Sequence, residues 1–146
     1  MNRGEFIKTC GLGCIGLSGL AQFVTSCTST KFANASINGE YLTVSLSEFE
    51  TEKKGIKTYK DHLILYNDQL QFPICVYRHS ATEYQALLMR CTHQGAELQV
   101  LGDRLYCPAH GSEFTNKGQV QNGPADEHLR TFPVSIENNL LKVSLK

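Results

Sequence analysis

Short stretches rich in apolar residues, separated by polar and turn-forming residues, follow one another along the chain after residue 40. The clearest stretch is residues 41–46, Y-L-T-V-S-L, whose alternation and β-branched residues are typical of a half-buried strand. After Cys27 we find no long window with the 3.6-residue period of a helix. The pattern therefore predicts an all-β domain, with further strands at residues 56–59, 63–66, 70–78, 84–90, 98–100, 104–106, 113–115, 131–136 and 140–145.

Turn-forming residues separate these strands. Gly102-Asp103 and Asn138-Asn139 each join two strands as hairpins, because glycine and asparagine tolerate the positive φ that tight turns require. Residues 47–55 are rich in charge and are predicted as a connection. Pro73 and Pro133 lie inside predicted strands, which favours edge positions or a bulge because proline has no N–H to donate.

The first 26 residues have a different pattern. Arg3 and Lys8 precede a stretch without charge, residues 9–30, and residues 12–24 are mostly apolar. A charged start followed by a short apolar core is the layout of a signal peptide. A spanning helix needs about 20 predominantly apolar residues. Because this core is short and rich in glycine, we expect residues 1–26 to be removed rather than to stay as an anchor.

The end of this segment, Val24-Thr25-Ser26-Cys27, resembles the lipobox of bacterial lipoproteins. The resemblance implies cleavage before Cys27 and attachment of lipid to its thiol, which anchors the protein to a membrane. An uncleaved anchor is the alternative. Residues 2–8 also resemble a twin-arginine export signal with Gly4 in place of the second arginine, so the general secretory route stays open. Residues 27–39, rich in Ser, Thr and Asn, are predicted as a flexible tether before a domain of residues 40–146.

Composition narrows the function. The 146 residues suffice for one domain of ordinary size, and 14 basic residues balance 14 acidic ones. The balance gives no electrostatic reason to expect nucleic acid as a partner. Three of the six cysteines lie in the first 27 residues, and two of the other three belong to the motif described next, so no disulfide framework is indicated.

Two short segments carry the candidate chemistry. Residues 91–96 read C-T-H-Q-G-A and residues 107–112 read C-P-A-H-G-S. The candidate ligands are Cys91, His93, Cys107 and His110, and such a set can hold one zinc ion or a two-iron cluster with two sulfurs on one iron and two imidazoles on the other. Zinc fingers and ribbons mostly use pairs of like ligands, whereas each segment here supplies one cysteine and one histidine.

This mixed pairing, with Gly95, Pro108, Gly111 and Ser112 beside it, resembles the Rieske [2Fe–2S] family. The resemblance implies an antiparallel β-sandwich base with an inserted cluster-binding subdomain at about residues 91–124. It also implies a [2Fe–2S] cluster with Cys91 and Cys107 on the inner iron and the Nδ1 atoms of His93 and His110 on the outer iron. Gly123-Pro124-Ala125 is similar to the proline loop that covers the cluster in this family.

The same resemblance predicts how the cluster is tuned. Ser112 matches a hydroxyl donor to a cluster sulfur, and Phe114 stands where a second donor, a tyrosine, is found in high-potential members. Ala96 and Ala109 stand where those members carry an inter-loop disulfide. We therefore expect an intermediate reduction potential. Cys75 is predicted to be a buried apolar side chain, and His62, His79 and His128 to be solvated.

The function that these features imply is single-electron transfer. We expect a membrane-tethered lipoprotein of the bacterial cell envelope that faces the periplasm and passes electrons between a membrane or periplasmic reductase and an acceptor such as a cytochrome. It is not a complete enzyme by itself, because no other catalytic constellation is present. The alternatives are a subunit of a quinol or arsenite oxidoreductase, a ferredoxin of a ring-hydroxylating dioxygenase, and a structural zinc module.

Overall fold

A computed structural model describes residues 31–146 of the chain. The predicted signal segment and the lipid site at Cys27 lie outside the described residues. Of the helices in residues 31–146, none is long and apolar enough to cross a membrane. The same residues contain one 3₁₀ helix, η1 (Leu46–Phe49), and strands make up most of their regular structure. The all-β prediction is confirmed.

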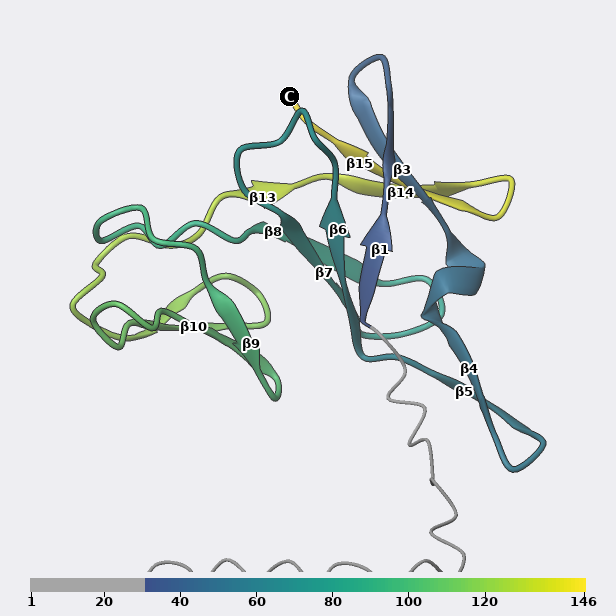
Figure 1. The fold of residues 1–146 in the computed structure, drawn as a ribbon, viewed down its shortest axis with the longest axis horizontal. Coiled ribbons are helices and arrows are strands. Elements are labelled where there is room, and N and C mark those ends of the chain that lie inside the picture. Colours follow the sequence, from purple (N-terminus) through teal and green to yellow (C-terminus); the bar gives the residue numbers. More distant parts are fainter. Residues whose placement is uncertain (1–30) are drawn as a thin grey trace, which may run out of the picture.

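A five-stranded sheet forms the middle layer of the molecule, in the order β1-β6-β7-β8-β13 (Figure 1). Its pairs are antiparallel except for β1 with β6, which are parallel. Strands β6 and β7 are buried along nearly their whole length, so they do not show the alternation of a half-solvated strand. The bounds are β1 (Phe32–Asn34), β6 (His62–Tyr66), β7 (Ile74–Arg78), β8 (Tyr84–Leu88) and β13 (Thr131–Phe132).

A second, four-stranded sheet packs against one face of the middle sheet. Its order is β14-β15-β3-β2, with every pair antiparallel. Alternate residues of the two sheets, such as Leu42 and Val143 with Leu63 and Val76, form one apolar core and bury it from water. This sandwich is the predicted base. The bounds are β2 (Ser36–Asn38), β3 (Tyr41–Ser45), β14 (Val134–Glu137) and β15 (Leu140–Ser144).

The other face of the middle sheet is covered by the cluster subdomain, which carries its own antiparallel sheet in the order β12-β11-β10-β9. Ile64, Cys75 and Leu87 point to this side and share a second core with Leu105 and Phe114 of the subdomain. The middle sheet thus has a packed layer on each of its two faces, which explains why its central strands β6 and β7 are buried along nearly their whole length. The bounds are β9 (Gln99–Leu101), β10 (Arg104–Tyr106), β11 (Glu113–Thr115) and β12 (Val120–Asn122).

Residues 47–55 were expected to be a charged connection, and this was wrong. They contain most of η1 (Leu46–Phe49), which places Phe49 in the base core, and the start of a two-stranded hairpin, β4 (Glu50–Lys53) with β5 (Ile56–Tyr59). The Lys54-Gly55 turn has φ of 53° and 76°, the left-handed pair that a two-residue hairpin requires. The hairpin projects from the base, away from the cluster subdomain (Figure 1).

The predicted tether also needs correction, because residues 32–38 are strands of the base. β1 pairs with β6, and Ala33 and Ala35 are buried in the base core. The side chain of Asn67 donates to the carbonyl oxygen of Ala35 at 2.9 Å, and Lys31 is paired with Asp61 at 2.6 Å. These contacts hold the chain to the base from Lys31 onward. A flexible tether can therefore include only residues that precede Lys31.

The prediction of an edge strand or a bulge was wrong for Pro73 and right for the strands beside Pro133. Pro73 lies just before β7, which is a central strand. The carbonyl oxygen of Pro73 accepts a hydrogen bond from Met89 N–H at 3.0 Å. Pro133 separates β13 from β14, and each of these is an edge strand of a different sheet. The chain therefore crosses from one sheet to the other at Pro133, where a missing N–H costs no sheet hydrogen bond.

Candidate metal centre

The first loop (residues 91–96) and the second loop (residues 107–112) have the same backbone hydrogen bonds. Cys91 N–H donates to Ala96 O, and Gly95 N–H donates to Cys91 O, both at 2.8 Å. The second loop repeats this pair from Cys107 to Ser112 O at 2.8 Å and from Gly111 to Cys107 O at 2.9 Å. Gly95 and Gly111 both have positive φ, 76° and 81°, which L side chains rarely adopt. The glycines therefore let each loop turn back over its own cysteine.

The loops bring two thiols and two imidazoles to one end of the subdomain. Cys91 and Cys107 are 2% and 1% exposed, while His93 is half-buried and His110 is exposed. The two imidazole rings lie 5.0 Å apart between centroids and nearly perpendicular, at 86°. The thiols are thus on the inner side and the imidazoles on the outer side.

The donor set fits a two-iron cluster. Nδ1 of His93 is buried and has no hydrogen-bond partner among residues 31–146, which is costly for a polar atom unless something else binds it. Within the same residues, no three Cys, His, Asp or Glu side chains surround a single ion position. A [2Fe–2S] cluster with mixed ligation needs only two protein ligands at each iron.

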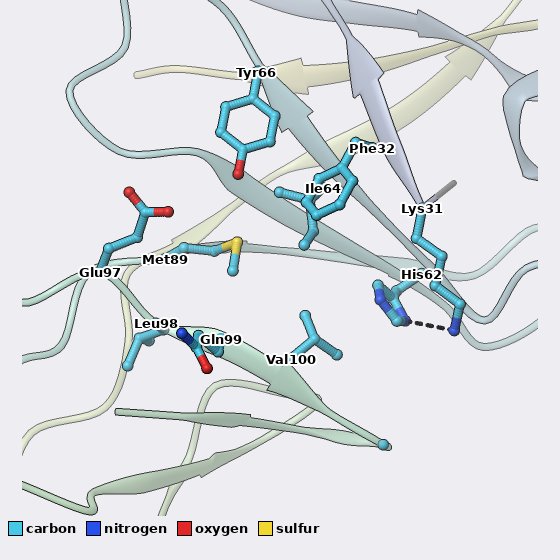
Figure 2. Close-up of a pocket in the computed structure, with 11 residues that line it drawn as sticks. Lys31, Phe32, His62, Ile64, Tyr66, Met89, Glu97, Leu98, Gln99 and Val100 are labelled. Carbon is cyan, nitrogen blue, oxygen red and sulfur yellow. Dashed lines mark hydrogen bonds between the residues drawn. The ribbon is translucent and has the colours of Figure 1, made fainter. Parts of the chain in front are cut away.

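Two hollows lie near this part of the molecule. The one at the first loop is about 500 Å³ and is bounded by Arg90, Cys91, His93 and Glu127, so it belongs to the candidate metal centre. A larger cleft of about 670 Å³ separates the base from β9 and is lined by apolar side chains such as Ile64, Met89 and Val100 (Figure 2). None of the four candidate ligands lines the larger cleft.

A third loop (residues 123–127) closes over both others. Ala125 is buried in the core shared with the two cysteines, and its N–H donates to the Ser112 hydroxyl at 3.0 Å. The Thr92 hydroxyl donates to Glu127 O at 2.7 Å. The sequence predicted that residues 123–125 cover the site, but it did not predict that Thr92 holds this loop in place. The position of Thr92, between the candidate ligands Cys91 and His93, could have indicated such a role.

The buried Ser112 hydroxyl is 0% exposed. Because it accepts from Ala125, its own hydrogen remains free for another acceptor, and no such acceptor is found among the described protein atoms within hydrogen-bond distance. Phe114 lies next to this position in the core, opposite Leu105. The two residues predicted to set the potential are therefore both buried, Ser112 at the end of the second loop and Phe114 in the strand β11 that follows it.

The family model of the Rieske [2Fe–2S] domain matches residues 40–133, which is more than half of the chain. The chain belongs to the Rieske [2Fe–2S] domain family. Its cofactor is accordingly a [2Fe–2S] cluster, and the protein is an electron carrier of the Rieske type.

Curated relatives match the Rieske domain over a limited length. The chain is 33% identical over 57 residues to the cytochrome b6-f complex iron-sulfur subunit of Chlorobaculum tepidum, which is 38% of this chain and 32% of the relative. It is 38% identical over 56 residues to the subunit of the same name from Synechococcus sp., covering 37% and 32%. The matched region thus spans about a third of these relatives.

Solved structures resemble a larger part of the chain. The plasma membrane Rieske protein of Synechocystis PCC 6803 is 26% identical, with 57% of this chain and 86% of that chain covered and a TM-score of 0.50. The structure of reduced oxygenase with oxidised ferredoxin in carbazole 1,9a-dioxygenase gives 23% identity, coverages of 75% and 96%, and a TM-score of 0.55, which supports the fold alone.

The remaining predicted residues lie away from the loops. Cys75 is buried in the middle sheet, and burial, with a smaller contribution from Asp61, raises the pKa of its thiol well above the usual range. This agrees with the prediction of an unreactive apolar side chain. His79 is exposed, and exposed His128 accepts from Val120 N–H through Nδ1 at 3.1 Å.

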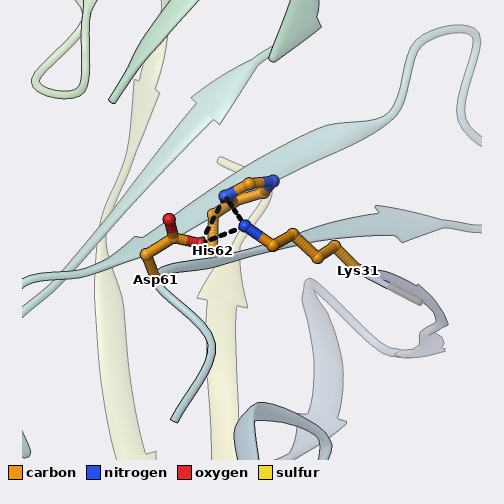
Figure 3. Close-up of polar contacts among 3 residues, drawn as sticks. All are labelled: Lys31, Asp61 and His62. Atoms are coloured by element: carbon orange, nitrogen blue, oxygen red, sulfur yellow. Dashed lines mark hydrogen bonds and ion pairs between the residues drawn. The ribbon is translucent and has the colours of Figure 1, made fainter. Parts of the chain in front are cut away.

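The prediction that His62 is solvated was wrong. His62 is 5% exposed, its ring lies against that of Tyr77, and its Nδ1 is 2.8 Å from a carboxylate oxygen of Asp61 (Figure 3). Burial, and then the neighbouring Lys31, lowers the pKa of His62. Nothing in the local sequence indicated this, because His62 is packed against Tyr77 of β7 and against Lys31, which are both distant from it in the sequence.

Proposed function

We propose that Cys91 and Cys107 bind the inner iron of the cluster and that Nδ1 of His93 and of His110 binds the outer iron. The observation that carries this assignment is the duplicated loop framework, which holds one buried cysteine and one outer histidine in each loop. The unpartnered Nδ1 of His93 supports it independently.

When bound in this way, the cluster supplies a one-electron couple, and its neutral imidazole ligands place the potential roughly between −150 and +300 mV. The residues around it have separate tasks. Leu105 and Phe114 pack behind the cysteines and keep water from that side. Ser112 holds its hydroxyl below the second loop, where we propose that it donates to a cluster sulfur and stabilises the more negative, reduced state.

Electrons enter and leave at the exposed side of the loops. His110 lies there with Pro108 and Ala109 of the second loop, Gln94 of the first and Pro124 of the third, all exposed and without formal charge apart from the imidazole. A small uncharged surface suits brief encounters, since redox complexes have among the smallest protein interfaces.

We further propose that the protein is tethered by lipid at Cys27 on the periplasmic side of a bacterial membrane. It would pass single electrons between a membrane or periplasmic reductase and an acceptor such as a cytochrome. The sequence of residues 1–27 supports the anchor. A second candidate, a Rieske subunit of a multi-component oxidoreductase, is favoured by the relatives named as subunits of cytochrome b6-f complexes.

The test is a chemical and spectroscopic analysis of protein extracted from membranes. Red-brown protein with two irons and two acid-labile sulfides per chain, and a low average g-value by electron paramagnetic resonance after reduction, is expected. Colourless protein with one zinc per chain would refute the cluster assignment. The intact mass should correspond to lipid on Cys27 without residues 1–26; a mass that includes Met1 would show an uncleaved segment. Co-purification of other subunits would favour the second candidate.

A further inference from the structure

The β4–β5 hairpin is a projecting element with an apolar residue at its tip. Ile56, the first residue after the turn, is 66% exposed, the largest exposure of any large apolar side chain in residues 31–146. Tyr59, further down β5, is half exposed. An isoleucine in this position does not contribute to the core. A single exposed apolar side chain is ordinary on a protein surface, so the residues around Ile56 decide whether it marks a contact site.

Lysines surround this tip. Lys53 faces Ile56 across the hairpin, Lys54 occupies the turn, and Lys57 follows Ile56. Lys57 is paired with Glu50 at 2.7 Å, whereas within residues 31–146 neither Lys53 nor Lys54 makes an ion pair. The tip therefore combines an exposed apolar side chain with two unpaired lysines, and one exposed carboxylate, Glu52, lies opposite Lys57.

The hairpin is held firmly at its base. Lys60 N–H donates to Phe49 O at 2.7 Å, and the buried Phe49 ring packs edge-on against Tyr84 at 5.3 Å. The Thr51 and Thr58 hydroxyls are 2.6 Å apart across the strands. The guanidinium of Arg78 lies 4.3 Å from the centre of the Tyr59 ring. These contacts fix the direction in which the tip points.

The chain enters the domain next to this hairpin. Lys31, the first described residue, lines one shallow hollow together with Lys53, Lys60 and Tyr59. Lys31 is also fixed to the base by Asp61 (Figure 3). Three residues separate Lys31 from Cys27, and four extended steps span at most about 14 Å. A lipid on Cys27 would therefore hold the hairpin close to the bilayer surface.

We infer that the β4–β5 hairpin docks on the headgroup layer of an anionic bilayer, with Ile56 inserted and Lys53 and Lys54 facing lipid phosphates. The inference rests on the proposed anchor at Cys27. Apolar insertion flanked by lysines is the combination that binds anionic membrane surfaces. The cluster subdomain lies at the other end of the long axis of the molecule (Figure 1). Docking in this orientation leaves His110 and its uncharged rim away from the lipid and open to a soluble acceptor.

The structure also offers a matched control. The β14–β15 hairpin has the same two-residue turn with positive φ, Asn138-Asn139, and Leu140 follows it as Ile56 follows Lys54-Gly55. Leu140 is 39% exposed, but it faces Glu137 instead of a lysine. Because the chain contains no tryptophan, Ile56→Trp and Leu140→Trp each introduce a single fluorescent reporter.

The experiment uses the full, cluster-loaded chain on vesicles of phosphatidylglycerol and phosphatidylethanolamine with brominated acyl chains. Ile56→Trp fluorescence should shift to the blue and be quenched by bromine, and Leu140→Trp fluorescence should not change. In a Cys27→Ala background that also lacks residues 1–26, whose apolar core could bind vesicles by itself, Lys53→Gln with Lys54→Gln should weaken vesicle binding on the order of tenfold. High salt should weaken it as well.

The possible outcomes distinguish membrane docking of the β4–β5 hairpin from lipid attachment at Cys27. A lipidated protein that sediments with vesicles while Ile56→Trp stays unquenched overturns the inference and leaves the proposed function intact. Equal quenching at both positions overturns it too, since the domain would have no fixed orientation. Crosslinking of position 56 to a protein without quenching identifies a protein partner and overturns it. Absence of lipid on Cys27 refutes the anchor, and the Cys27→Ala measurements still decide whether the hairpin binds lipid.

Discussion

The first loop and the second loop start from one backbone framework and present different side chains. In the first loop, the Arg90 guanidinium lies against Gly95, the Thr92 hydroxyl is tied to the third loop, and His93 is half-buried. In the second loop, Gly111 has open space around it and His110 is exposed. The first loop is enclosed by its neighbours, whereas the second carries the exposed candidate ligand, His110.

The difference between the loops separates two tasks. Under the proposed ligand assignment, holding the cluster depends on features that both loops share, namely the buried cysteine and the turn over it. We expect docking of redox partners and tuning of the reduction potential to depend on features that only the second loop has, namely the exposed His110 and the buried Ser112 hydroxyl. Substitutions at shared positions should therefore have similar effects in both loops, and substitutions at unshared positions should not.

The largest effect is expected from loss of a cysteine. Cys91→Ala and Cys107→Ala should each reduce iron and acid-labile sulfide from two per chain to nearly none, because each removes one of the two proposed ligands of the inner iron. The control is Cys75→Ala, a buried thiol outside the loops, which should keep its cluster. Metal and sulfide analysis with visible absorption measures this. Retention of two irons by either loop variant would contradict the equal role of the two cysteines.

The glycines should show the next largest effect. Gly95→Ala and Gly111→Ala should each lower the free energy of unfolding by about 1–2 kcal/mol, because an L residue at positive φ is strained. Gly95→Ala should be the worse of the two, since its Cβ would lie 3.2 Å from Nε of Arg90. Gly39→Ala, with positive φ in a loop with open space, reports the backbone strain alone. Denaturant unfolding gives all three values, and a neutral Gly111→Ala would disprove the shared framework.

The loops were the part of the fold that sequence could predict best. Their geometry depends on residues close together in the chain, such as Cys107, Gly111 and Ser112, so local chemistry determines it. The hairpin at Asn138-Asn139 was predicted for the same reason, and both residues have positive φ. The enclosed character of the first loop was not predicted, because Thr92 contacts a residue 35 positions away.

The sequence predicted that the base is an antiparallel β-sandwich, but it did not predict which strands form each sheet. Ala33 and Ala35 alternate with polar residues, a period of two that could have indicated β1 and β2, but alanine is too small to give a clear hydrophobic signal. The burial of His62 depends on Tyr77 of the paired strand β7 and on Lys31, which are both distant in the sequence. Long-range pairing of this kind leaves little trace in a single sequence.

The hydroxyls of Ser112 and Thr92 test whether binding of the cluster and control of its reduction potential depend on different residues. The Ser112 hydroxyl has a free hydrogen, and Ser112→Ala should lower the reduction potential by some tens of millivolts, where 30 mV for one electron is roughly 0.7 kcal/mol. The Thr92 hydrogen is already donated to Glu127 O. Thr92→Val should therefore cost about 0.5–1.5 kcal/mol of stability and leave the potential nearly unchanged.

Protein-film voltammetry and denaturant unfolding, on both variants at one pH, distinguish these effects. An unchanged potential in Ser112→Ala would mean that the hydroxyl does not reach a sulfur. A Thr92→Val potential that falls as far as that of Ser112→Ala would mean that loop position, and not a hydrogen bond, sets the potential.

The smallest effect is expected from a gain of hydroxyl at Phe114, which is fully buried in the strand β11 that follows the second loop and packs opposite Leu105. Phe114→Tyr should raise the potential by some tens of millivolts, and by no more than Ser112→Ala lowers it, because a second donor to the cluster again favours the reduced state. The control is Phe132→Tyr, which makes the same change in the base core and should leave the potential unmoved. The combined Ser112→Ala and Phe114→Tyr variant should return toward the original value, since the two donors act on the same charge. If Phe132→Tyr shifts the potential equally, the effect does not arise from a hydrogen bond beside the second loop, and tuning is not confined to that loop.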